Sequence, residues 1–180
     1  MPGTSVARCC LTADPRQWRW PGGLRLLPGN YRAAVNATIL AVLLACLLVA
    51  LSDWVMRDVL PPVYRDRYTS PLWPRSAWIS LAAMREEVVY RLGLQSLLAA
   101  LPALAGRKTG PRWMIAAIVL AQLANVGVLA LVWPPYGLIR FWLVGCIWGW
   151  LYWKHGFASA LAGHGMSHLL LDPLLLVALA

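Results

Sequence analysis

Two adjacent acids stand in a part of this sequence that is otherwise apolar, and their spacing from a nearby base is typical of acid–base chemistry. Glu86 and Glu87 are followed by Arg91, four residues after Glu87. On a helix this spacing lets Arg91 neutralise and orient Glu87, while Glu86 points about 100° away without a partner. An unpaired carboxylate of this kind is a group that takes a proton from water. The motif therefore predicts a general base, Glu86, beside a supported acid, Glu87.

A second polar cluster lies near the end of the sequence. His164, His168 and Asp172 follow one another at intervals of four residues, so they form one stripe on a helix. In this stripe Asp172 can accept a ring N–H from His168 and fix its tautomer. Asn125 and Gln122 are the strongly polar residues of another apolar segment. Ionisable groups inside membrane helices cost at least about 2.5 kcal/mol each, so the acids and histidines are candidates for function.

The composition of the chain indicates that these residues lie in a membrane. Of 180 residues, 60% are hydrophobic and 13% are charged, whereas soluble domains have about 45–50% apolar and about 25% charged residues. The net charge is +9, but the basic residues lie at the margins of apolar runs, which argues against nucleic acid as a partner. The four cysteines form no disulfide or metal-binding pattern. The lipid bilayer is therefore the expected environment.

The elements that must position the two clusters are long apolar runs. They predict an all-α fold, a polytopic membrane bundle of about five transmembrane helices. The runs cover residues 35–52, 76–105, 113–133, 137–153 and 157–180. The stretch 53–75 predicts an extramembrane loop. We expect two parts, a basic juxtamembrane arm at 1–32 and an integral membrane helical domain at 33–180.

The basic residues predict how the bundle is oriented. With the N-terminus in the cytoplasm, nine basic residues lie inside, in the arm and the short loops, against four in the loop 53–75. At 1.5 Å per residue, Glu86, Asn125 and His164 all come near the midplane of a hydrocarbon core about 30 Å thick. We therefore expect three helices to bring these side chains together.

The two clusters, in this order and on separate apolar segments, resemble a known family of membrane proteins. Residues Glu86 to Arg91 match EExxxR, and His164-Gly-Met-Ser-His168 resembles HxxxN or HxxxD. These are the motifs of the CAAX protease and bacteriocin-processing family of glutamic intramembrane proteases, also called the Abi family. The likeness runs from about residue 80 to residue 171, roughly half of the chain.

The resemblance implies an intramembrane endopeptidase of the bacterial inner membrane. Its substrate would be a membrane-anchored or lipid-modified protein, cleaved near its terminus, and neither a metal nor another cofactor is implied. By this likeness Glu86 activates a water and Arg91 holds Glu87. His164 and His168 then donate hydrogen bonds to the oxyanion, a contribution of roughly 3–4 kcal/mol per donor.

Two positions depart from the family pattern. The family's middle motif is FxxxH, and the matching stretch here, residues 121–125, ends in Asn125. An Asn amide can hydrogen-bond a water but cannot take its proton. His168 stands where the family has Asn or Asp. These departures leave a second interpretation open, a catalytically impaired relative that acts as a binding or immunity protein.

Two further classes of protein remain open at this stage. The HxxxH spacing and Glu86 together offer two imidazoles and a carboxylate to zinc, although the HExxH general base is absent. Glu and His near the membrane midplane also build proton relays in transporters, although the sequence has no repeated halves. Sensitivity to chelators and proton-coupled flux, respectively, distinguish these classes from the protease.

Overall fold

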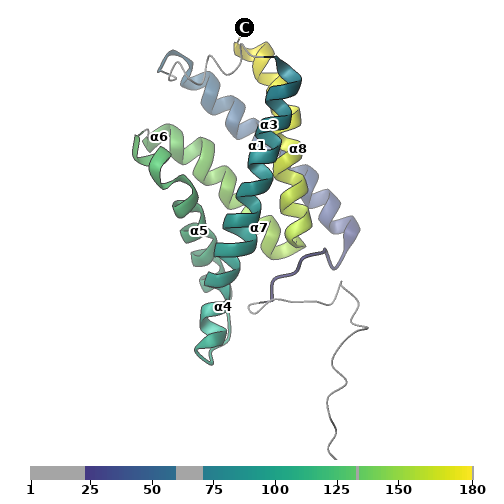
Figure 1. Ribbon diagram of the computed structural model, residues 1–180, viewed down its shortest axis with the longest axis vertical. Coiled ribbons are helices and arrows are strands. Elements are labelled where there is room, and N and C mark those ends of the chain that lie inside the picture. Colours follow the sequence, from purple (N-terminus) through teal and green to yellow (C-terminus); the bar gives the residue numbers. More distant parts are fainter. Residues whose placement is uncertain (1–22, 60–70, 133, 180) are drawn as a thin grey trace, which may run out of the picture.

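The computed structural model describes residues 23–59, 71–132 and 134–179, and within these ranges the chain forms helices and no strand. Figure 1 shows the helices packed side by side as long rods. The helices form five rods. Three rods are single helices: α1 (Tyr31–Val55), α5 (Pro111–Val132) and α8 (Phe157–Leu179). The second rod consists of α3 (Leu72–Glu86), a π-helical stretch (Glu87–Gln95) and α4 (Ser96–Leu104), and the fourth consists of α6 (Pro134–Gly137), a second π-helical stretch (Leu138–Leu143) and α7 (Val144–His155). The predicted all-α fold with five helices is confirmed.

The first rod, α1, has the clearest membrane character. It begins after Asn30, whose side chain accepts a hydrogen bond of 3.1 Å from the backbone N–H of Ala33, as N-cap residues do. No charged residue follows Arg32 until Asp53. Judged by length and composition, α1 is the one helix in the described residues that is long and apolar enough to cross a bilayer.

The core forms where α7 and α8 pack against α1. Trp148 and Leu151 of α7 are fully buried, and they contact a row of small residues on α1 that includes Ala41 and Ala45. α8 lies between α1, α3 and α7 and contacts all three (Figure 1). The small side chains of α1 let a large indole fill the space between helices, and this places α8 beside the EExxxR motif.

The predicted loop 53–75 is shorter than expected. α1 continues to Val55 and α3 begins at Leu72, so Asp53 and Arg75 belong to helices and are buried. The sequence predicts a loop for both because charged residues at the margin of an apolar run are ordinarily solvated. Residues 60–70 lie outside the described residues.

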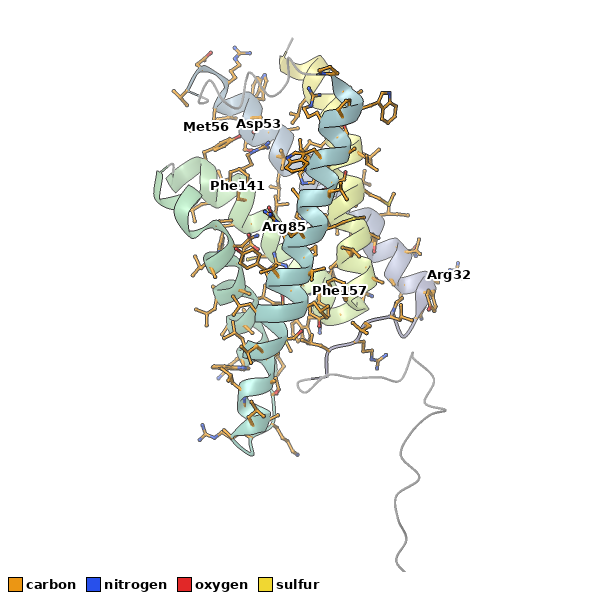
Figure 2. The ribbon with its side chains drawn as sticks, in the orientation of Figure 1. Arg32, Asp53, Met56, Arg85, Phe141 and Phe157 are labelled. Atoms are coloured by element: carbon orange, nitrogen blue, oxygen red, sulfur yellow. The ribbon has the colours of Figure 1, made fainter. Side chains whose placement is uncertain are left out.

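A charge pair explains why Asp53 is buried. Its carboxylate lies 3.0 Å from the Arg140 guanidinium and accepts a hydrogen bond of 2.8 Å from the Tyr136 hydroxyl. Figure 2 labels Asp53 near the end of α1 and Phe141 on the neighbouring rod. The pair therefore joins α1 to the segment between α6 and α7, 87 residues away in the sequence.

The described end of the predicted arm packs on the bundle. The segment crosses the turn between α7 and α8, where the Arg25 carbonyl accepts a hydrogen bond of 2.9 Å from the Phe157 N–H. Leu24 is fully buried in the same region. This contact satisfies one of the N–H groups that the start of a helix leaves free. Residues 1–22 of the arm lie outside the described residues.

Candidate functional site

A π-helical stretch, Glu87–Gln95, carries three polar residues into the core. A π-helix has hydrogen bonds from residue i to i+5, is rare, and is frequent at functional sites. Glu87, Arg91 and Gln95 are its buried residues, each no more than 1% exposed. Their spacing of four residues keeps them on one face of the wide turn. The EExxxR motif therefore directs its second acid and its base into the bundle.

Glu87 lies between two basic side chains. Its Oε1 atom is 3.7 Å from Arg91 Nε, so the predicted pair is present. The same oxygen is 2.9 Å from His164 Nδ1, a contact that the sequence did not predict. An ionised carboxylate only accepts hydrogen bonds, so Nδ1 of His164 is the protonated nitrogen when Glu87 is ionised. Glu87 thereby fixes the tautomer of the histidine.

Arg91 is anchored from two further helices. One of its terminal nitrogens donates to Gln122 Oε1 and to the Gly145 carbonyl, the second at 2.8 Å. The Gln122 amide in turn donates to the Phe141 carbonyl at 3.1 Å. A Cβ atom at position 145 would overlap the Gln122 amide, so any other residue there must displace this side chain. The sequence alone assigned no role to Gln122 or Gly145. The feature that could have indicated this close approach of helices is the pair Gly145 and Gly149, four residues apart on one helix face.

Glu86 points away from this network, as the sequence predicts, but it has a partner. Asn125 Nδ2, on the separate helix α5, donates a hydrogen bond of 3.4 Å to Glu86 Oε2, which is the approach of these two side chains that the sequence predicts. Both side chains are partly buried. The amide is neutral, so it leaves the charge of the carboxylate uncompensated.

The two histidines face one another on α8. Their Nε2 atoms are 3.3 Å apart, and their ring centroids are 5.1 Å apart. The indole of Trp148 stacks on His164 from the other side, with ring centroids 5.5 Å apart and an interplanar angle of 17°. Trp148 is fully buried and was not among the predicted site residues. The side chain of Asp172, the expected partner of His168, lies outside the described residues.

One cavity of about 580 Å³ connects these groups. Its lining includes five of the six residues that the sequence singles out, Glu86, Arg91, Asn125, His164 and His168. The sixth, Glu87, is 1% exposed and contacts the ring of His164. The cavity also reaches Trp148 and the apolar wall of α1. It thus offers a carboxylate, an amide and two imidazoles to whatever enters it.

A metal centre was one of the open interpretations. Across residues 23–59, 71–132 and 134–179, no group of three or more His, Cys, Asp or Glu side chains is placed to hold a metal ion. The buried partners of Glu87 are instead Arg91 and His164. Chemically, the arrangement can move a proton at Glu86 and offer ring N–H groups on the opposite wall.

Comparisons with known proteins identify no relative. No protein-family model matches the chain, and no curated protein or solved structure is similar to it. The resemblance to the CAAX protease and bacteriocin-processing family therefore depends on the two motifs and on the site that they form.

Proposed function

We propose that the chain is a glutamic intramembrane endopeptidase of the CAAX protease and bacteriocin-processing kind. It would cleave a membrane-anchored or lipid-modified protein near its terminus. The observation that carries the proposal is the cavity shared by Glu86, Asn125, His164 and His168. Glu87 and Arg91 form the buried support behind it.

The proposal places residues 33–180 in a bilayer as a polytopic bundle. Besides α1, the helices α5 and α8 have 22 and 23 residues, and 22 residues of helix span about 33 Å, enough for a core about 30 Å thick. Large apolar side chains such as Leu40 and Trp78 are more than half exposed, as lipid-facing residues are. The distribution of basic residues supports a cytoplasmic N-terminus. The family resemblance supports the bacterial inner membrane.

The reaction begins with a water held between Glu86 and the scissile carbonyl. Glu86 takes a proton from this water, and the oxygen attacks the carbonyl carbon to form a tetrahedral oxyanion. The C–N bond then breaks, and Glu86 returns the proton to the leaving amine. The products are a new carboxyl terminus and a new amino terminus. Asn125 orients Glu86 or the water but takes no proton.

The histidines supply hydrogen bonds to the oxyanion in this scheme. With Nδ1 of His164 bound to Glu87, its Nε2 atom faces His168. A neutral His164 is therefore an acceptor at Nε2, and His168 is the donor between them. A second donor to the oxyanion requires a protonated His164, whose positive charge lies next to Glu87. Because Nδ1 is held by Glu87, Nε2 is the nitrogen of His164 that is left to face the oxyanion.

The decisive experiment compares Glu86→Gln with the unchanged protein. Both are expressed in bacterial membranes, and new peptide termini are mapped by mass spectrometry in water enriched in ¹⁸O. Hydrolysis places one ¹⁸O atom in each new carboxyl terminus, and we expect these termini to fall at least 100-fold with Glu86→Gln. The matched control is Asp58→Asn, which neutralises an exposed acid. Equal processing by the unchanged protein and Glu86→Gln would exclude the proposed protease.

A second candidate function is a binding or immunity protein derived from such a protease. Asn125 favours it, because the amide that contacts Glu86 cannot act as an acid or a base. In this case no ¹⁸O-labelled termini form with the unchanged protein. A partner would still co-purify with Glu86→Gln, and a bulky side chain in the cavity, as in Ala82→Trp, would release it.

A further inference from the structure

A second cavity lies at the end of the bundle where α1 begins. It has a volume of about 340 Å³ and shares no lining residue with the carboxylate–imidazole cavity. Its walls come from the segment 23–33 and from the turn 153–156 between α7 and α8. The proposed protease has no use for this cavity.

The lining of this cavity carries positive charge. Arg25 and Lys154 contribute this charge beside the imidazole of His155, and no acidic residue of the described chain lines the cavity. The Lys154 ammonium also lies 3.9 Å from the ring centroid of Trp153, a cation–π contact. Burial and, as the smaller cause, the neighbouring Lys154 ammonium lower the pKa of His155. An anion in the cavity would offset the charges of Arg25 and Lys154.

Backbone contacts hold the walls of the cavity in place. Gly156 has φ 92°, and a Cβ atom there would lie 3.0 Å from the carbonyl carbon and oxygen of Leu27. The segment therefore crosses the turn closely, over a residue that has no side chain. The hydrogen bond from the Phe157 N–H to the Arg25 carbonyl fixes the same crossing. The basic side chains thus project from a backbone that is already positioned.

The position of the cavity matches the level of lipid headgroups. Figure 2 labels Arg32 on the first turn of α1 and Phe157 on the first turn of α8, at the same end of the bundle. α1 is the helix best suited to cross a bilayer, so its first turn marks where the apolar core ends. Trp153, in the cavity wall, is of a residue type enriched at this boundary.

The volume of the cavity limits the size of its occupant. At about 30 Å³ per water molecule, 340 Å³ corresponds to about eleven waters. This is enough for a phosphate with a small alcohol such as glycerol. A headgroup that ends in choline carries a permanent positive charge, and the described lining has no acid to pair with that charge. The lining therefore favours a headgroup with net negative charge.

We propose that this cavity binds the phosphate of an anionic phospholipid headgroup, with phosphatidylglycerol as the representative class. Arg25 and Lys154 supply the charge, and the turn at Gly156 shapes the wall. The site takes no part in peptide hydrolysis, so this proposal is tested independently of the proposed protease.

The test uses the full-length protein purified in a neutral detergent. Short-chain phosphatidylglycerol and phosphatidylcholine with the same acyl chains are titrated, and native mass spectrometry counts the lipids bound per protein. We expect one phosphatidylglycerol to bind at least tenfold more tightly than phosphatidylcholine. Each basic residue near a lipid surface contributes about fivefold in affinity, so Lys154→Gln should weaken binding about fivefold and Arg25→Gln with Lys154→Gln about 25-fold.

The matched control is Arg107→Gln with Lys108→Gln, which removes the same charge from an exposed loop that lines neither cavity. This variant should keep its phosphatidylglycerol affinity within twofold. Equal losses in the two double variants would overturn the proposal, as would equal binding of the two lipids. Displacement of the lipid by inorganic phosphate at equal concentration would assign the cavity to free phosphate instead. If the Arg25 variant fails to fold, the exposed Lys154→Gln decides alone.

Discussion

His164 Nδ1 lies 2.9 Å from Glu87 Oε1, so the imidazole that lines the cavity is held by the second acid of the EExxxR motif. The same carboxylate oxygen is 3.7 Å from Arg91 Nε. One acid therefore joins the two motifs, which lie 77 residues apart in the sequence. Two predictions about stability follow from this network.

The first prediction concerns the charge of Glu87. Glu87→Gln keeps the size of the side chain but leaves the buried Arg91 guanidinium without an anion, which costs about 3–5 kcal/mol in the free energy of unfolding. The measurement is unfolding in detergent, followed by circular dichroism. Glu86→Gln makes the same chemical change one residue earlier, at a partly buried side chain, and should cost much less. Equal losses would mean that Glu87 and Arg91 do not form a charge pair.

The second prediction concerns the close approach of α5 and α7. Gly145→Ala places a Cβ atom where the Gln122 amide lies, so Gln122 must move and Arg91 loses an acceptor. Overpacking of this kind costs about 1–3 kcal/mol. Gly127→Ala is the matched control, because a Cβ atom there meets nothing within 4 Å and alanine favours a helix. The two variants should therefore shift the unfolding temperature in opposite directions.

Much of the candidate site was predictable from the sequence. Spacings of four residues place Glu87 with Arg91 and His164 with His168 on single helix faces, whatever the neighbouring helices do. The common depth of Glu86, Asn125 and His164 then follows from helix lengths alone. The structure brings these three residues to the lining of one cavity.

The support of the site was not predictable in the same way. Gln122 and Trp148 act through contacts with residues on other helices, and no local spacing encodes those contacts. The π-helical turn at Glu87–Gln95 also depends on its surroundings, since Gln95 donates a hydrogen bond of 3.0 Å to the Gly149 carbonyl of α7. The burial of Asp53 is likewise absent from local spacing, because its partner Arg140 lies 87 residues away.

The third prediction concerns that distant pair. Asp53→Asn removes the carboxylate that lies 3.0 Å from the buried Arg140 guanidinium, and we expect a loss of about 3–5 kcal/mol in the free energy of unfolding. Replacing both residues by apolar side chains of similar size, Asp53→Leu with Arg140→Met, should cost less than Asp53→Asn alone. A double-mutant cycle on the unfolding free energy measures this coupling. Additive losses would show that the two charges do not stabilise one another.

The fourth prediction concerns the pKa of His155, whose surroundings include Arg25 and Lys154. Burial and then Lys154 lower this pKa from its usual 6.5, so the unfolded chain takes up the proton at a higher pH than the folded chain does. The contribution of His155 to stability is therefore present above pH 6.5 and is lost as the pH falls through the lowered pKa. Lys154→Gln removes the second cause and should raise the pKa. The chain has three histidines, so isotope-labelled His gives an assignable NMR titration; an unchanged pKa would contradict the prediction.

The last prediction separates the protease from the impaired relative. Asn125→His puts an imidazole beside Glu86, where it can share the proton that Glu86 takes from water. General acid–base groups contribute about 10²–10⁴-fold to rates, so a weakened protease should form ¹⁸O-labelled termini at least tenfold faster with this variant. Asn125→Ala is the control, because it removes the amide without adding a base, and it should slow the same reaction. In a binding protein neither variant produces labelled termini, and both weaken capture of the partner, because the cavity wall changes while no chemistry depends on it. An unchanged rate of labelling in both variants would place Asn125 outside the reacting site. It would also contradict the match of residues 121–125 to the family's middle motif.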